Sequence, residues 1–257
     1  MDKTSADFRV VRKRMFNSSF ALFVLTPVDE NLILEDIEAG QFVQVLTGNR
    51  GSFLRRPISI NLVEDGGRLI HLLIRDAGEG TRWLIAREEG DIVNMIVPLG
   101  HGFTMPDRKD FRSLLVGGGV GIAPLLFLGT EMKKRGITPE FLIGARSADL
   151  LLELDELRAV GPVHVATDDG SAGEHGLVTQ HSAMAGQYDR IYCCGPSPMM
   201  KGVAAIARER GIDCEVSLEN MMGCGVGACL CCVEKTVRGN VCVCTFGPVF
   251  NINELTW

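Results

Sequence analysis

Residues 114–124 read Leu-Leu-Val-Gly-Gly-Gly-Val-Gly-Ile-Ala-Pro, and this stretch decides the fold of the central part of the chain. Three apolar residues suited to a buried strand run into a glycine-rich turn, and a helix-forming segment follows. This order is the context that a dinucleotide-binding fingerprint requires, with the pyrophosphate near the start of the helix. The spacing is not a strict G-x-G-x-x-G, but an ordinary tight turn between strand and helix needs fewer glycines. We expect a nicotinamide dinucleotide to contact four of them: Gly117, Gly118, Gly119 and Gly121.

From this stretch onward, segments suited to strands alternate with segments suited to helices. Strands are expected at residues 113–116, 140–143, 163–167 and 190–194, and helices at 123–135, 150–158, 177–184 and 198–210. The alternation predicts a doubly wound parallel sheet with helices on both faces. From about residue 213 onward the pattern breaks.

A second glycine turn follows the strand expected at residues 190–194. Ligands of open α/β sheets bind outside the carboxyl ends of the strands. This turn lies at that edge and opens the next helix, so two glycine-rich turns could embrace one nicotinamide. The residues expected to do so here are Cys194, Gly195 and Pro196.

The first hundred residues follow a different sequence pattern, in which short apolar segments are separated by turn signals. The segments are residues 20–25, 42–45, 58–62, 69–74 and 92–97, and one helix is expected near residues 80–88. This spacing suits a small antiparallel β-barrel. A polar stretch at residues 106–110 reads as a linker. We therefore expect a two-domain α+β and α/β protein, with a barrel domain over 1–105, an α/β domain over 106–212 and a cysteine-rich segment over 213–257.

Two short stretches of the expected barrel domain suit a second dinucleotide. Arg56-Pro57-Ile58-Ser59 begins a strand, where the arginine fork suits a pyrophosphate and Ser59 can hydrogen-bond the edge of an isoalloxazine ring. Alone, this stretch is better explained as a strand with an exposed arginine. The second stretch ends a strand with Leu73-Ile74-Arg75 and then places Gly78-Glu79-Gly80-Thr81 at a helix start, a context suited to an anion. Two such elements in one small β-domain predict a flavin dinucleotide.

The cysteines gather near the end of the chain. None of the nine precedes Cys193, and six lie between Cys224 and Cys244. Cysteines at this density usually hold metal rather than form disulfides in a cytosolic chain. Cys224, Cys229 and Cys232 form C-x₄-C-x₂-C, which together with a distant fourth cysteine is the plant-type [2Fe–2S] spacing. Intervening glycines let the loop curl around a small cluster.

Spacing alone leaves the fourth ligand open, because Cys231, Cys242 and Cys244 are all available. Cys244 is favoured, since residues 245–248 make a turn just after it. A Cys₄ zinc site is an alternative, but zinc sites more often show two C-x₂-C knuckles, and only one such pair is present. Buried, unligated cysteine is the remaining alternative for Cys193, Cys214 and any spare cysteine of the cluster.

Composition excludes several classes of function. The 257 residues carry 26 Lys and Arg against 32 Asp and Glu, a net charge of −6, with no basic block suited to nucleic acid. No apolar run reaches membrane-spanning length, and the N-terminus lacks the apolar segment of a signal peptide. A cytoplasmic location is therefore expected.

The order of these motifs resembles that of the ferredoxin reductase superfamily. R-P-x-S at 56–59 is followed by G-x-G-T at 78–81, G-G-G-x-G-x-A-P at 117–124 and C-G-P-x-P-M at 194–199. The cysteine segment, which starts Met-Met-Gly-Cys-Gly-Val-Gly-Ala-Cys at 221–229 and ends Gly-Pro-Val-Phe at 247–250, is similar to that of the electron-transfer subunits of type B dihydroorotate dehydrogenases.

This resemblance implies particular cofactor contacts. It implies FAD contacts at Arg56, Pro57, Ile58, Ser59, Leu73, Ile74, Arg75, Gly80 and Thr81, and [2Fe–2S] ligands at Cys224, Cys229, Cys232 and Cys244. It also implies an oxidoreductase subunit of pyrimidine biosynthesis. Such a subunit passes electrons from an FMN-containing dihydroorotate dehydrogenase catalytic subunit through the cluster and FAD to NAD, in a heterotetramer of two plus two.

Two other functions stay open. The chain could resemble the small subunit of an NAD(P)H:ferredoxin or sulfide-linked flavin oxidoreductase, which shares the motifs. It could also be a zinc-stabilised binding module without redox activity. NAD is preferred over NADP, because Asp168 and Asp169 argue mildly against a 2′-phosphate, although Arg146 could serve one.

Overall fold

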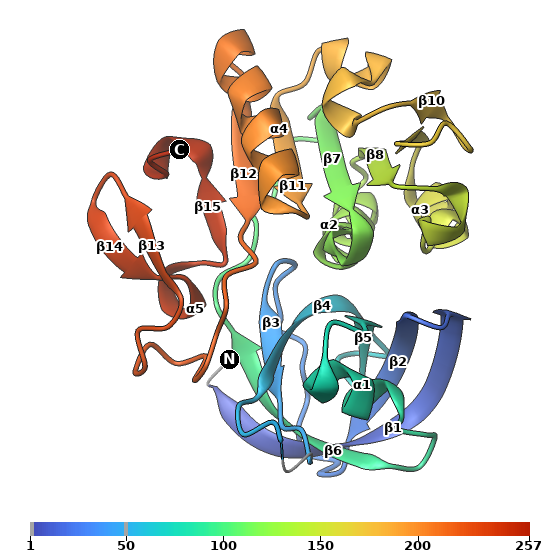
Figure 1. Ribbon diagram of the computed structural model, residues 1–257, viewed down its shortest axis with the longest axis vertical. Coiled ribbons are helices and arrows are strands. Elements are labelled where there is room, and N and C mark those ends of the chain that lie inside the picture. Colours follow the sequence, from blue (N-terminus) through green and yellow to red (C-terminus); the bar gives the residue numbers. More distant parts are fainter. Residues whose placement is uncertain (1–2, 49–50) are drawn as a thin grey trace. The chain divides into compact units, whose positions relative to one another are not determined.

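The computed structural model describes residues 3–48 and 51–257 (Figure 1). These residues divide into two compact units. The first comprises Met1–Gly102, Asn220–Glu234 and Val241–Pro248, and the second Phe103–Glu219, Lys235–Asn240 and Val249–Trp257. The last 45 or so residues, expected as a separate segment, are thus shared between the two units.

The first unit contains the antiparallel barrel that the sequence predicts. Its strands are β1 (Thr4–Asn17), β2 (Phe20–Pro27), β3 (Phe42–Val45), β4 (Arg56–Glu64), β5 (Leu69–Arg75) and β6 (Ile92–Leu99). They close in the order β1-β2-β5-β4-β3-β6, and every neighbouring pair is antiparallel. Helix α1 (Glu79–Ile85) follows β5 and ends three residues before the expected boundary.

Strand β1 is the element that sequence reasoning missed. It pairs with both β2 and β6, so it closes the barrel and leaves neither neighbour as an edge. Phe8 and Val10 are fully buried, but most of the other side chains face solvent, and many of them are charged. A strand with so few inward-facing apolar residues lacks the alternation by which strands are recognised.

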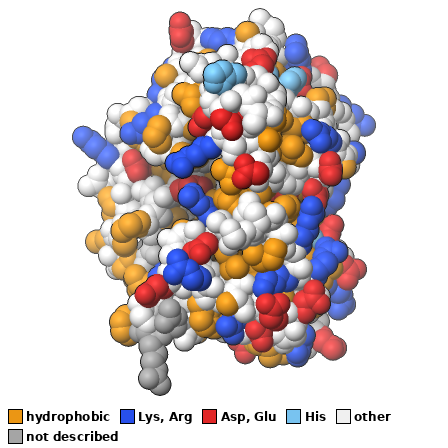
Figure 2. All heavy atoms as spheres, turned by 45° about the vertical axis from the view of Figure 1, so that its right-hand side comes forward, with side chains coloured by type: hydrophobic (Ala, Val, Ile, Leu, Met, Phe, Trp, Pro, Cys, Tyr) orange, Lys and Arg blue, Asp and Glu red, His pale blue; other side chains and the backbone are white. Residues whose placement is uncertain are grey.

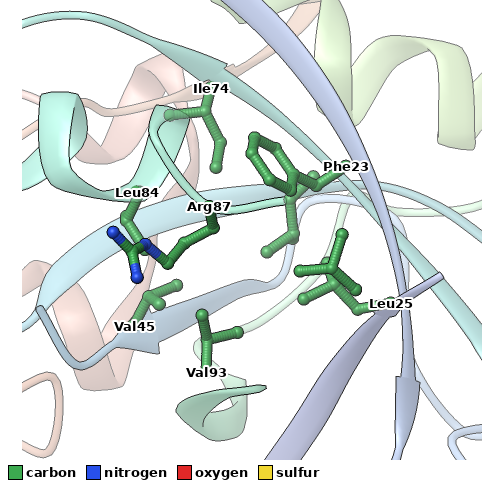
Figure 3. Close-up of a pocket in the computed structure, with 9 residues that line it drawn as sticks. Phe23, Leu25, Val45, Ile74, Leu84, Arg87 and Val93 are labelled. Carbon is green, nitrogen blue, oxygen red and sulfur yellow. The ribbon is translucent and has the colours of Figure 1, made fainter. Parts of the chain in front are cut away.

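The barrel interior contains a small apolar hollow (Figure 3). Val45 of β3 and Ile74 of β5 point into it, and Arg87 also lines it. The guanidinium carbon of Arg87 lies 4.3 Å from the centroid of the Trp83 ring. Because side chains alternate along a strand, the inward direction of Val45 places its neighbour Gln44 on the outer face of β3.

The second unit contains the predicted parallel sheet. Its strand order is β10 (Glu174–His175), β9 (Val163–Thr167), β8 (Glu140–Ala145), β7 (Ser113–Gly118), β11 (Arg190–Cys194), β12 (Asp213–Ser217) and β15 (Val249–Asn251). Neighbours are parallel except β12 and β15, which are antiparallel. Strand β12 shows that the break expected at residue 213 was wrong, since the parallel sheet continues for one more strand.

Helices cover both faces of this sheet. They are α2 (Ile122–Lys134), α3 (Leu154–Val160) and α4 (Ser197–Arg210). A Cβ placed on Gly129 of α2 would lie 2.5 Å from the Phe141 ring, whereas one on Gly144, three residues further along the same strand, would meet Val178. An odd spacing along a strand puts these two contacts on opposite faces.

The helix expected at residues 177–184 is absent. Two short 3₁₀ turns stand there instead, Val178–Gln180 and Ser182–Ala185. His181 between them has an extended backbone (φ −66°, ψ 141°), and its Nδ1 accepts the Ala183 N–H at 2.9 Å. This side-chain hydrogen bond competes with the helical pattern and separates the two turns.

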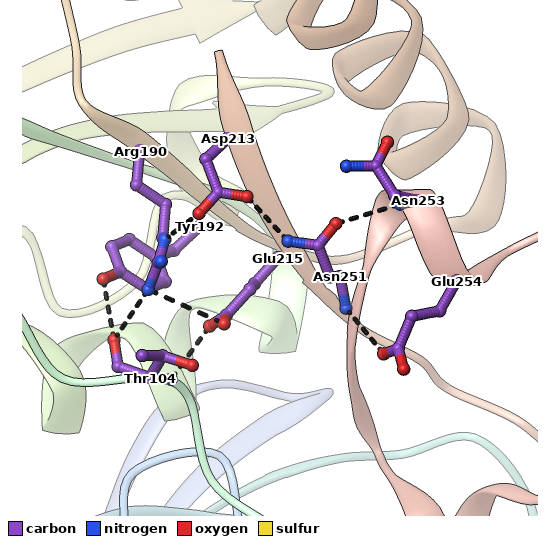
Figure 4. A network of polar contacts seen from close by, with 8 residues as sticks. All are labelled: Thr104, Arg190, Tyr192, Asp213, Glu215, Asn251, Asn253 and Glu254. Carbon is purple, nitrogen blue, oxygen red and sulfur yellow. Dashed lines mark hydrogen bonds and ion pairs between the residues drawn. The ribbon is translucent and has the colours of Figure 1, made fainter.

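A polar network ties the last strand into the sheet (Figure 4). Arg190 Nε lies 2.6 Å from an Asp213 carboxylate oxygen, and Asn251 Nδ2 donates to the other oxygen at 2.6 Å. Beside them, the Thr104 N–H donates to Glu215 at 2.9 Å. Arg190 Nη1 also lies 3.7 Å from Glu215, whose side chain is only 8% exposed. Arg190 is therefore the cation that balances a nearly buried carboxylate.

Arg190→Met is expected to lower the free energy of unfolding by about 2–3 kcal/mol, because it leaves the Glu215 charge uncompensated. Urea unfolding measures the effect. Arg158→Met is the control, since its ion pair with Asp155 is solvent-exposed and worth at most about 1 kcal/mol. Equal losses in the two variants would contradict a structural role for the network.

Two observations concern nucleic-acid binding and membrane spanning, the classes of function that the composition argues against. On the face that Figure 2 displays, basic and acidic side chains are interspersed. Of the helices in the described ranges, none is both long and apolar enough to span a membrane.

Candidate functional site

The part of the cysteine-rich segment that carries the six clustered cysteines belongs to the first unit. It consists of Asn220–Glu234 and Val241–Pro248, joined by the hairpin of β13 (Val233–Thr236) and β14 (Gly239–Cys242), and it ends with the short helix α5 (Val243–Phe246). Cys232 and Cys244 are buried, Cys224 and Cys242 are half-buried, and Cys229 and Cys231 are exposed. The segment is held against the barrel end, where the His101 N–H donates to the Gly247 carbonyl at 2.7 Å.

Backbone N–H groups point at the sulfurs of this segment. Cys224 Sγ accepts three of them, from Val226, Ala228 and Cys229, at 3.3–3.4 Å. Cys244 Sγ accepts one from Gly227 at 3.2 Å. The chain curls this tightly because its glycines adopt positive φ, 81° at Gly227. Such nests of N–H groups are the surroundings that iron–sulfur clusters occupy.

The four predicted ligand thiols lie as two pairs. Cys224 contacts Cys229, and Cys244 contacts Cys232, whose Sγ also accepts the Cys244 N–H at 3.4 Å. Two pairs of thiols match the chemistry of a [2Fe–2S] cluster, which needs four thiolates shared between two irons. Within residues 3–48 and 51–257, no group of three or more His, Cys, Asp or Glu side chains is placed so that it could hold a single metal ion.

The two pairs differ in their electrostatics. Burial raises the pKa of Cys224, but the hydrogen bonds from Val226, Cys229 and Ala228 outweigh it and lower that pKa to about 6. Burial and the neighbouring Cys232 thiol raise the pKa of Cys244 to about 12. The N–H groups of its own loop thus stabilise Cys224 as a thiolate.

The cysteines that are not predicted ligands have other surroundings. The Cys242 side chain also contacts Cys232, and burial raises the pKa of Cys242. Cys193 and Cys214 lie fully buried in the parallel sheet, where burial raises the pKa of both thiols. These two therefore behave as core residues.

The structure brings together the two stretches predicted to bind flavin. Arg56 at the start of β4 reaches the first turn of α1, where a Cβ on Gly80 would lie only 2.5 Å from Arg56 Nε. The guanidinium donates to the Leu54 carbonyl at 2.8 Å and to Ser52 Oγ at 2.5 Å. Ser52 was not predicted, and no local signal in the sequence marks it. Glycine at position 80 is what lets the arginine lie across the turn.

Thr81 closes the same turn. Its hydroxyl accepts the Ala77 N–H at 2.8 Å and donates to the Gly78 carbonyl at 3.1 Å. These two hydrogen bonds fix the shape of the turn, in which Gly78 adopts a φ of 152°.

The remaining predicted flavin residues divide between the two faces of the barrel. Pro57 and Ser59 are half-buried on the outer face of β4, and Arg75 is exposed at the end of β5. The side chains that are buried are Ile58, Leu73 and Ile74. Ile74 points into the barrel (Figure 3), so it can offer a ligand only its backbone.

The two turns predicted to bind nicotinamide meet at one point of the sheet. Strand β7 lies next to β11, and the strand order reverses between them, which is the switch point where ligands bind in open α/β sheets. A Cβ on Gly121 would lie 2.5 Å from the Cys194 carbonyl carbon, and one on Gly195 would lie 3.1 Å from the Gly118 nitrogen. Only glycines allow backbones to approach this closely. The Cys194 side chain is buried, so only its backbone faces the point where the two turns meet.

The residues considered for NAD preference lie beyond the ends of β8 and β9. Arg146 is exposed, and its carbonyl accepts the Asp169 N–H at 3.2 Å. The Asp169 carboxylate accepts hydrogen bonds from the hydroxyl and the N–H of Ser171, which lower its pKa. Asp169 therefore caps a turn, and Asp168 beside it is exposed.

Comparison with known proteins places the chain in a family. Residues 219–256 match the family described as the iron–sulfur cluster binding domain of dihydroorotate dehydrogenase B. The electron transfer subunit of dihydroorotate dehydrogenase B (NAD(+)) of Fusobacterium nucleatum subsp. nucleatum is 38% identical over 234 residues, 88% of this chain and 89% of that one. The subunit of the same name from Lysinibacillus sphaericus is 36% identical over 249 residues, 94% and 95% of the two chains.

A solved structure agrees with these matches. The NADH-dependent reduced ferredoxin-NADP oxidoreductase, studied for flavin-based electron bifurcation, superposes with a TM-score of 0.85 at 29% identity, covering 97% of this chain and 90% of the other. Its similarity extends over both units and confirms the ferredoxin reductase fold. From its sequence relatives, the chain belongs to the family of electron transfer subunits of dihydroorotate dehydrogenase B (NAD(+)).

Proposed function

We propose that this chain takes electrons from a dihydroorotate-oxidising catalytic subunit and delivers them to NAD, using FAD and a [2Fe–2S] cluster. One observation carries the proposal: four thiols lie as two pairs, Cys224 with Cys229 and Cys232 with Cys244, among backbone N–H groups. The chain also has relatives named for this activity. We assign the cluster ligands as Cys224, Cys229, Cys232 and Cys244. A cytoplasmic location is part of the proposal, because ligand thiols must stay reduced.

The cofactors, when bound, supply the redox chemistry, since a cluster passes single electrons and a flavin joins them to two-electron transfer with nicotinamide. The chain binds and orients them. The Cys224 loop favours thiolates through its N–H groups, and Arg56 offers a fork of donors to the flavin pyrophosphate. Gly121 and Gly195 let two backbones form the nicotinamide site. No general acid or base is needed among these residues.

Arg56→Ala is expected to raise the Kd for FAD by about 10–100-fold, because a charge-assisted hydrogen bond contributes about 1.5–3 kcal/mol. Titrating FAD into the deflavinated variant and following flavin fluorescence measures this. Arg82→Ala on helix α1 is the control, since the exposed Arg82 pairs with the nearby Asp76. An unchanged Kd in Arg56→Ala would remove Arg56 from the flavin site.

The partner would meet the chain at the cysteine segment. Large apolar side chains there are exposed in the isolated chain, among them Met221 at 81%, Leu230 at 65% and Phe246 at 59%. Leu54, 54% exposed, lies beside them, because a Cβ on Gly223 would be 3.9 Å from its Cδ1. Apolar surface gathered next to a cofactor is typical of a protein interface. We therefore propose that an FMN-containing catalytic subunit covers this surface, in a heterotetramer of two plus two.

Met221→Glu is expected to weaken this complex by on the order of tenfold or more, since it puts a charge into an apolar interface. Titration of the catalytic subunit measures the Kd, and dihydroorotate-dependent reduction of NAD falls with it. Leu177→Glu, at an exposed apolar position in the second unit (55%), is the control. Iron content and NADH-dependent flavin reduction stay unchanged in both variants. Equal affinities in Met221→Glu and the unaltered protein would move the interface elsewhere.

A second candidate, the small subunit of an NAD(P)H:ferredoxin oxidoreductase, is favoured by the similarity to the reduced ferredoxin-NADP oxidoreductase. Reconstitution separates the two. The first proposal expects the chain to couple an FMN-containing dihydroorotate dehydrogenase subunit to NAD. A chain that instead binds a large iron–sulfur flavoprotein would support the second. A colourless, zinc-loaded protein without flavin would end both.

A further inference from the structure

One buried side chain of the first unit lacks the partners that its chemistry requires. Gln44 on β3 is 0% exposed, yet neither its Nε2 nor its Oε1 has a hydrogen-bond partner among the described residues. His71 is the other such residue in the described ranges, but its Nε2 lies 2.9 Å from a Glu64 carboxylate oxygen. An unpaired buried amide costs about 1–3 kcal/mol. Such a group calls for a partner that the polypeptide itself does not supply.

The Gln44 side chain lies directly against the cysteine loop. It leaves the outer face of β3, because its neighbour Val45 points into the barrel. A Cβ on Gly225 would lie 2.6 Å from Gln44 Cγ and 3.2 Å from Gln44 Nε2. Gly225 directly follows Cys224, whose sulfur already accepts three backbone N–H groups. The amide nitrogen therefore lies against the loop that carries Cys224.

On its other side, Gln44 adjoins the strand assigned to flavin. It pairs in register with Pro57 of β4, which follows Arg56. The backbone carbonyl of Gln44 accepts a hydrogen bond from Arg55 Nη1 at 3.1 Å, so it is the side-chain amide that has no partner among the described residues. Gln44 thus lies between the flavin strand and the cysteine loop, and its close contact is with the loop.

We propose that Gln44 tunes the [2Fe–2S] cluster, donating a hydrogen bond from its carboxamide to a cluster or ligand sulfur beside Gly225. The proposal rests on the cluster assignment made above. Hydrogen bonds to the sulfurs are among the determinants of cluster reduction potentials. A donor favours the more negative, reduced state, so Gln44 raises the potential of the cluster. The same bond satisfies the buried amide, which is why a polar residue is tolerated within an otherwise apolar strand.

The test is a redox titration of the holoprotein, with the cluster followed by EPR and the flavin by visible absorption. Gln44→Leu removes the donor at nearly constant volume. We expect a roughly tenfold shift against reduction of the cluster, which is about 59 mV for a one-electron couple, and an unchanged flavin potential. Gln44→Glu places a carboxylate at the same position and is expected to shift the cluster potential further in the same direction.

A second measurement separates tuning from packing. In the protein stripped of its cluster, Gln44→Leu is expected to unfold at the same or a higher temperature, because an unpaired amide has been removed. Gln41→Leu is the matched control, since both ends of its amide are already bonded, to Gly100 and Glu38, and its cluster potential is expected to stay unchanged. If Gln44→Leu proves unstable, Gln44→Met keeps an unbranched side chain of similar length.

The outcomes distinguish this inference from the proposed function. A cluster potential that is equal in Gln44→Leu, Gln44→Met and the unaltered protein overturns the role of Gln44 and leaves the function standing. A shift confined to the flavin potential overturns it as well. Unaltered protein that holds no cluster after reconstitution with iron and sulfide overturns the cluster assignment itself.

Discussion

Cys244→Ser is expected to abolish the [2Fe–2S] cluster and to reduce dihydroorotate-dependent reduction of NAD by on the order of 100-fold or more. Cys244 is fully buried, its sulfur accepts the Gly227 N–H at 3.2 Å, and it contacts Cys232. A serine at this position has a shorter, harder oxygen ligand and cannot complete a four-thiolate set. Iron and sulfide content, together with the EPR spectrum of the reduced protein, measure the loss.

Two neighbouring cysteines serve as controls for this substitution. Cys231 is exposed, and Cys242 is half-buried beside Cys232. Cys231→Ser and Cys242→Ser are therefore expected to retain iron, sulfide and activity. A Cys242→Ser protein without a cluster, beside a Cys244→Ser protein that keeps one, would exchange the roles of these two residues.

Gly121→Ala is expected to lower kcat/KM for NADH by on the order of 100-fold, since displacements of about 1 Å in a binding site have effects of this size. The added Cβ would lie 2.5 Å from the Cys194 carbonyl carbon and 2.7 Å from the Gly195 nitrogen. Both are backbone atoms that no rotamer change can move aside, so the two turns at the switch point must separate. Reduction of bound flavin by NADH in a stopped-flow experiment measures the effect.

A second glycine in the same unit separates this effect from general destabilisation. Gly211 ends helix α4 with a φ of 65°, and a Cβ there would meet nothing within 4 Å. Gly211→Ala is expected to lower stability by about 1–2 kcal/mol through backbone strain alone, with kcat/KM for NADH unchanged. If Gly121→Ala reduces its flavin as fast as the unaltered protein, the two turns do not form the nicotinamide site.

Several features were predictable because they depend on residues that are close in sequence. The strand, turn and helix around residues 114–124 follow from an apolar run, a set of glycines and a helix-forming segment, and the structure reproduces them within two residues. Five of the six barrel strands carry enough apolar residues to be recognised. The cysteine spacing likewise predicts a cluster segment, and the family match over residues 219–256 confirms it.

Other expectations failed where a distant contact or a single side chain overrides local pattern. Strand β1 is largely polar and acquires its place by pairing with β2 and β6. The helix expected at residues 177–184 is divided by His181, whose ring accepts a backbone N–H. Strand β12 continues a parallel sheet that local pattern appeared to end, because β11 offers it a free edge.

The sequence by itself determined the two kinds of fold, the order of the cofactor motifs and the set of cysteines, since each depends on spacing along the chain. Only the tertiary structure decided which thiols pair, that Arg56 crosses Gly80, and that Gln44 is buried without a partner beside the cysteine loop. These facts join residues that are 12, 24 and about 180 positions apart, as their numbers show. Spacing along the chain is read directly from the sequence. The burial of a side chain and the approach of distant residues arise only when distant segments pack together.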